Sequence, residues 1–163
     1  MNSKKKYIIG GPSRSGKTTL VNIINMQNES VVALPVESLL QVFYTRIYPF
    51  KSFQKKTILR EFLKQSRCMD EGRKEFARPL DFFQSDFDTI ARSIPNNCHH
   101  QIQIFEYALD LFAKENNAAT WIVHDIHVES LFSELKKYIP DLHLIIFLRD
   151  PRESVCANLY WRC

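Results

Sequence analysis

Short apolar runs alternate with amphipathic segments along this chain of 163 residues. Four runs have the composition of buried strands, because apolar and β-branched residues dominate them. They are residues 7–9, 31–34, 121–123 and 142–148. The segments after the first and third runs have apolar residues at helical spacing. Strands of this kind that alternate with helices predict an α/β fold of three layers, with a mostly parallel sheet covered on both faces.

The region between the second and third apolar runs, residues 36–117, follows a different pattern. Its apolar residues recur at helical intervals, most clearly in 96–116, where Ile102, Phe105 and Leu109 share one face. We therefore expect a mostly helical insertion between the second and third strands. The aromatic residues of this region are expected to belong to its core.

The first strand is followed by a motif whose chemistry is specific. Residues 11–18 read Gly-Pro-Ser-Arg-Ser-Gly-Lys-Thr, which fits the pattern G-x-x-x-x-G-K-[ST]. Between a strand and a helix, such a loop points successive backbone N–H groups at one anion, and the positive end of the helix adds to their field. Lys17 would reach the outer phosphates, and the Thr18 hydroxyl would bind magnesium. The expected cofactor-binding residues are Gly11, Ser13, Arg14, Ser15, Gly16, Lys17, Thr18 and Thr19.

Further candidate residues follow the other strands, where α/β sheets bind their ligands. Asp125 ends the third strand and would hold magnesium, or else cap the next helix. Glu37 follows the second strand and would orient or deprotonate an acceptor hydroxyl, or else favour the start of a helix. Arg149 and Arg152 would bind phosphate or sulfate oxygens, or else pair with nearby acids. With Lys17, these four are the candidate catalytic residues.

Composition narrows the class of protein. A net charge of +4 suits small anionic ligands and does not call for nucleic acid. The four cysteines lack C-x-x-C spacing, and Cys98-His99-His100 has no second cluster, so no zinc site is expected. No stretch has the apolar length of a signal peptide or a membrane span. We expect one cytoplasmic domain over residues 1–163, with no membrane partner.

Residues 8–40 resemble the P-loop small-molecule kinases of the nucleotide kinase group, through Gly10 to Leu20 and a second strand that leads to Glu37. The sequence Asp125-Ile126-His127 is similar to a recurrent feature of the same group. The resemblance implies a P-loop NTPase fold, ATP and magnesium as cofactors, Glu37 near the acceptor and an arginine-bearing lid. The implied activity is transfer of the γ-phosphoryl group to a small anionic or hydroxyl-bearing acceptor held by the helical insertion.

Residues 147–154 resemble instead the sulfotransferases that use an adenosine 3′-phosphate 5′-phosphosulfate donor. There the resemblance implies that Arg149 grips the 3′-phosphate. The chain departs from that family at Ala157, where a serine is usual, and in its Gly16-Lys17-Thr18. The sequence ends at Cys163, before the further strand and lid usual in the kinases. Either the domain is truncated or its adenine contacts come from elsewhere. A nucleotide-binding regulatory or interaction domain with little turnover is a third hypothesis for the function.

Overall fold

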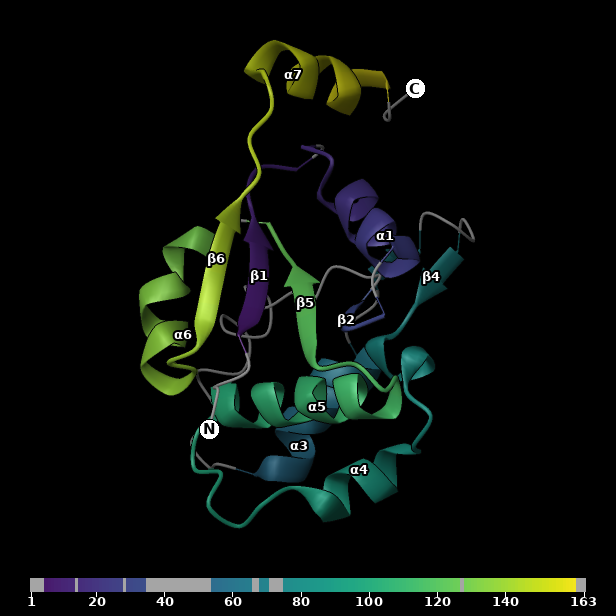
Figure 1. Cartoon of the computed structure of the whole chain (residues 1–163), viewed down its shortest axis with the longest axis vertical. Helices are drawn as coiled ribbons and strands as arrows, with labels where there is room; N and C mark the ends of the chain where they lie inside the picture. The colour runs from purple at the N-terminus through teal and green to yellow at the C-terminus, as the bar shows by residue number, and fades with distance from the viewer. Residues whose placement is uncertain are drawn as a thin grey trace.

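The computed structural model describes residues 5–13, 15–27, 29–34, 54–65, 68–70, 75–126 and 128–160. Within them, four parallel strands form one sheet in the order β2-β5-β1-β6 (Figure 1). The strands are β1 (Lys6–Gly10), β2 (Val31–Ala33), β5 (Thr120–His124) and β6 (Leu142–Ile146). The predicted α/β class and parallel sheet are confirmed.

The helices lie close to their expected positions. They are α1 (Lys17–Gln27), α3 (Lys55–Arg60), α4 (Phe87–Ser93), α5 (Gln101–Glu115), α6 (Phe132–Tyr138) and α7 (Pro151–Tyr160). Shorter helical turns are η1 (Glu61–Gln65), η2 (Pro79–Phe82) and η3 (Val128–Ser130). The helix expected over 96–116 begins only at Gln101, because His100 is its N-cap and accepts a hydrogen bond from the N–H of Ile102. The helix expected over 128–138 is divided at Leu131.

The insertion is helical in most of its described residues, but it also contains an antiparallel pair of strands that the sequence did not predict. These are β3 (Cys68–Asp70) and β4 (Glu75–Ala77). Each has three residues, too few to show the alternation that identifies a strand. The spacing of apolar residues in 38–46 also predicts a helix, but these residues lie outside the described part of the chain.

Two apolar cores lie on the two faces of the sheet. Ile8 and Val123 belong to the larger one, with Phe105 of α5 and Leu135 of α6. Side chains alternate along a strand, so Ile9 falls on the opposite face, where it packs with Val21 of α1 in the smaller core. Helices therefore cover both faces, and α1 and α6 lie on opposite sides of the sheet.

Helices do not fully cover strand β6. This contradicts the expectation that all four apolar runs are buried. β6 is an edge strand, and Ile145 and Ile146 are 38% and 44% exposed. Helix α7 lies beyond the carboxyl end of β6, away from the sheet (Figure 1). Among the helices in the described part of the chain, none combines the length and apolar character needed to cross a bilayer.

Candidate functional site

The loop between β1 and α1 is fixed by the two neighbouring strands. The N–H of Asp125, after β5, donates to the carbonyl of Ile9 at 3.0 Å, and the N–H of Phe147, after β6, donates to the carbonyl of Gly10 at 3.0 Å. Gly11 has φ +129°, and a Cβ there would lie 2.2 Å from the Phe147 carbonyl oxygen. Both its conformation and its surroundings therefore require glycine. Gly16, with φ +100°, meets the same restriction on conformation.

Lys17, the first residue of α1, lies inside this loop. Its side chain is buried, and its ammonium donates to the carbonyl oxygens of Gly11 at 3.0 Å and Pro12 at 2.7 Å. Ser15 is also buried, and its hydroxyl has no hydrogen-bond partner in the described structure. Ser13 and Thr19 are exposed, whereas Thr18 is half-buried. A charge and a hydroxyl are thus both withdrawn from bulk water at the start of one helix.

Two polar side chains at the end of β5 lie against the loop. His124 and Asp125 are fully buried, and His124 is in register with Ile9 of β1. The hydroxyl oxygen of Thr18 lies 3.2 Å from Nε2 of His124. One carboxylate oxygen of Asp125 accepts a hydrogen bond from the N–H of Ile126 at 2.8 Å. The predicted Thr18 and Asp125 therefore both lie at this edge of the sheet, and the side chain that contacts Thr18 is His124.

Burial is the main cause of the shifted pKa of His124 at this site. Loss of hydration lowers the pKa of His124 from 6.5 to about 4, and the nearby positive charge of Lys17 lowers it further in the same direction. The imidazole is therefore neutral at pH 7. A neutral ring can accept a hydrogen bond at one nitrogen and donate at the other.

The two candidate arginines occupy a different place. Arg149 donates to Glu153 at 2.8 Å, and Arg152 pairs with Asp150 at 2.8 Å. These are contacts at the start of α7, and the side chain of Arg152 is 90% exposed. The arrangement is the surface pairing that the sequence left open as an alternative. Their catalytic role stays a prediction, and Glu37 and Arg14 lie outside the described residues.

The sequence reasoning gave no role to His124 or Phe147, although both line the loop. A histidine at the end of an apolar strand, directly before an acid, was the available signal for His124. Its contact with Thr18 depends on the register of β5 beside β1, which the sequence pattern does not contain. The sequence pattern places Phe147 at the end of a strand and at the start of the segment that resembles the sulfotransferases, but it does not predict that Phe147 lies against the loop glycines through its backbone and ring.

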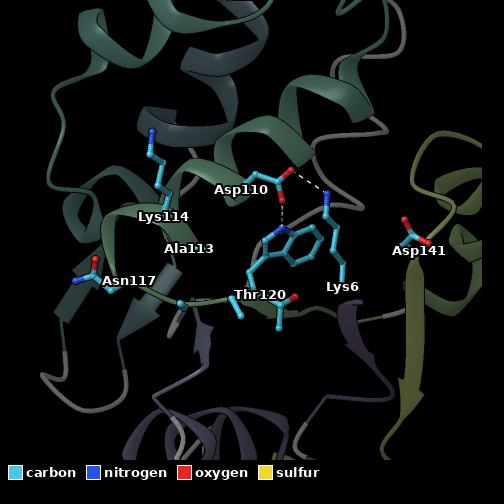
Figure 2. Close-up of a pocket in the computed structure, with 10 residues that line it drawn as sticks. Lys6, Asp110, Ala113, Lys114, Asn117, Thr120 and Asp141 are labelled. Atoms are coloured by element: carbon cyan, nitrogen blue, oxygen red, sulfur yellow. Dashed lines mark hydrogen bonds and ion pairs between the residues drawn. The ribbon is translucent and has the colours of Figure 1, made fainter. Parts of the chain in front are cut away.

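The opposite end of the sheet holds a surface pocket of about 620 Å³ (Figure 2). The ammonium group of Lys6, one of the two lysines that line it, pairs with Glu106 at 2.6 Å and with Asp110 at 2.8 Å. The other oxygen of Asp110 accepts a hydrogen bond from the indole of Trp121 at 2.7 Å. Because the half-buried Lys6 and Glu106, the buried Trp121 and the exposed Asp110 bind one another, we assign this cluster a structural role.

No group of three or more His, Cys, Asp or Glu side chains suited to a metal occurs among the residues that the structure describes. Near the sequence Cys98-His99-His100, Cys98 is a buried free thiol and His100 caps α5. Comparison of the chain with models of known protein families, with curated proteins and with solved structures found no match.

Proposed function

We propose that this chain is a P-loop domain that binds ATP with magnesium and transfers the γ-phosphoryl group to a small anionic or hydroxyl-bearing acceptor. The observation that carries the proposal is the geometry of residues 11–13 and 15–18. A glycine-rich loop joins a buried strand to a helix and encloses the Lys17 ammonium, as phosphate binding requires.

The topology supports a ligand at this loop. β1 and β5 are neighbours, but the chain leaves β1 toward α1 on one face and leaves β5 toward α6 on the other. A crevice forms at the carboxyl edge of a sheet where adjacent strands diverge in this way, and ligands of α/β proteins bind there. Lys17, Thr18 and Asp125 all lie at that point of divergence.

The residues of the loop fit a nucleotide phosphate and its metal. The buried hydroxyl of Ser15 lacks a partner in the described structure, and phosphate oxygens would supply one. The hydroxyl of Thr18 and the carboxylate of Asp125 are oxygen ligands of the kind magnesium prefers. Magnesium takes few protein ligands when it binds together with phosphates, so the absence of a three-residue cluster among the described residues is compatible with this site.

Each group would then have a defined task. The two carbonyl oxygens that accept from Lys17 are neutral, so an anionic phosphate oxygen is the stronger acceptor for its ammonium. The loop N–H groups and the N-terminus of α1 orient the phosphates. Thr18 and Asp125 would hold the metal, which supplies charge neutralisation during transfer. Phosphoryl transfer depends mainly on such positioning and charge stabilisation.

Calorimetric titration tests the proposal. The chain is titrated with ATP and magnesium, with GTP and magnesium, and with adenosine 3′,5′-bisphosphate, and products are then sought by mass spectrometry after incubation with a panel of small acceptors. We expect ATP with magnesium to bind most tightly and one acceptor class to gain a phosphoryl group. Preference for the bisphosphate would replace the proposal with sulfuryl transfer, and ATP binding without any product would indicate a regulatory domain.

A pair of variants tests whether Asp125 binds the metal. Asp125→Asn should abolish the dependence of ATP affinity on magnesium, because it removes a charged oxygen ligand. Asp88→Asn is the matched control, since Asp88 is an exposed acid on α4 that pairs with Lys56. If both variants lost the magnesium dependence of ATP affinity equally, Asp125 would have no specific role in binding the metal.

A further inference from the structure

His124 lies against the loop and has no task in the proposed function. It is fully buried at the end of β5, and its Nε2 lies 3.2 Å from the hydroxyl oxygen of Thr18. The two residues are 106 positions apart, so the contact exists only because β5 is in register with β1. The contact therefore connects the end of the strand to the residue expected to bind the metal.

The hydroxyl of Thr18 has one proton and two lone pairs. If a lone pair of this oxygen is to face a cation, the hydroxyl proton must point away from the cation, toward a hydrogen-bond acceptor. One oxygen of Asp125 is already occupied by the N–H of Ile126. The imidazole nitrogen of His124 is at hydrogen-bond distance and, in the neutral ring, offers the required lone pair.

We infer that His124 is a positioning residue for the metal site: its Nε2 accepts the hydroxyl proton of Thr18 and so holds the Thr18 oxygen with its lone pairs toward the magnesium of the bound nucleotide. This inference rests on the proposed function, because it concerns the same metal. It adds a residue to the site that acts through Thr18 rather than by touching the nucleotide. Groups that orient a metal ligand in this way typically change metal affinity 10-fold to 100-fold when they are removed.

The first test needs no variant. The wild-type chain, with its histidines labelled with ¹⁵N, is examined by NMR at pH 7 with ATP and magnesium. We expect His124 to be neutral, with the proton on Nδ1 and with Nε2 showing the chemical shift of a hydrogen-bond acceptor. A proton on Nε2 would overturn the inference, because that nitrogen would then donate to Thr18.

The second test measures coupling between the two side chains. ATP affinity is determined by calorimetry with magnesium and with EDTA, and the ratio of the two affinities reports the contribution of the metal. We expect His124→Ala to lower this ratio roughly tenfold or more while affinity in EDTA changes little, and His124→Gln to restore part of it. His143→Ala, at an exposed histidine of β6, is the matched control and should leave the ratio unchanged.

A double-mutant cycle separates positioning from a purely structural role. In a Thr18→Val background, where the hydroxyl is absent, His124→Ala should have no further effect on the magnesium ratio. A full additional loss in that background would show that His124 does not act through Thr18 and would overturn the inference. If the wild-type chain binds ATP equally with magnesium and with EDTA, the metal site itself is disproved. If it binds no ATP at all, the proposed function is disproved, and the NMR result still decides whether Nε2 accepts from Thr18.

Discussion

The two ends of the parallel sheet use buried charge in opposite ways. At the amino end, Lys6 is bound by the carboxylates of Glu106 and Asp110. Burial alone would lower the pKa of Lys6, but its hydrogen bonds and attraction to these two acids outweigh burial and raise it. At the carboxyl end, the buried Lys17 donates to neutral carbonyl oxygens of its own loop. The first arrangement pairs its ammonium with two acids, whereas the second directs its ammonium to carbonyl oxygens of the loop that we propose binds phosphate.

The same difference appears in the backbone. Gly11 at the carboxyl end and Asn117 at the amino end both have positive φ, at +129° and +56°. The first is enclosed by Phe147, while the second follows the end of α5, where asparagine commonly adopts this conformation. A strict requirement for glycine is therefore found in the loop that we propose binds phosphate.

The largest expected effect comes from placing a side chain in that loop. Gly11→Ala should lower the free energy of unfolding by about 3 kcal/mol or more, because it combines an unfavourable φ with a collision against the Phe147 carbonyl. Asn117→Gly should change it little, since glycine adopts positive φ freely. Urea denaturation measures both variants. Similar free energies of unfolding for the two variants would show that position 11 does not require glycine.

A comparable effect is expected from acid at the carboxyl end. The pKa of His124 in the folded chain, about 4, lies below its ordinary value of 6.5, so the unfolded chain takes up the proton first as the pH falls. The stability due to the neutral ring is complete above pH 6.5 and is lost progressively down to pH 4, by about 3 kcal/mol. The measurement is urea denaturation without nucleotide across this range. His124→Gln should flatten that part of the profile, and an unchanged profile would contradict the assigned environment.

A smaller loss is expected at the amino end. Lys6→Met keeps the apolar stem but leaves Glu106 half-buried without its ammonium partner, and it should cost about 2 kcal/mol. Burial raises the pKa of Glu106, so much of that cost should disappear at acidic pH, where the carboxyl is neutral. Thermal unfolding at pH 7 and pH 4 checks this. A variant as stable as the wild type at pH 7 would show that the ion pair contributes little.

The smallest effect is expected at α7. Arg149→Ala should change ATP affinity less than threefold, because Arg149 pairs with Glu153 in an exposed position at the start of α7. Calorimetry with ATP and with adenosine 3′,5′-bisphosphate compares the two ligands. Loss of bisphosphate binding alone would support the sulfotransferase hypothesis for this end of the chain.

Local chemistry was predictable from the sequence, but neighbours across the sheet were not. The motif from Gly11 to Thr18 predicted the strand, loop and helix, since each residue type there serves a conformation or a ligand. The contact of Thr18 with His124 required the strand order and register. The burial of β6 was predicted wrongly for a different reason. An apolar run of this length predicts burial on both faces, but β6 is an edge strand, and Ile145 and Ile146 are partly exposed.

The most direct test of the contrast between the two ends is the thermal stabilisation by ATP with magnesium in three proteins: the wild type, Lys17→Met and Lys6→Met. At a ligand concentration 100 times Kd, the wild type should gain about 2.7 kcal/mol. Lys6→Met should melt at a lower temperature than the wild type without ligand but gain the same stabilisation from ATP with magnesium. Lys17→Met should gain no stabilisation from the ligand. An undiminished increment in Lys17→Met would contradict the assignment of the phosphate-binding loop.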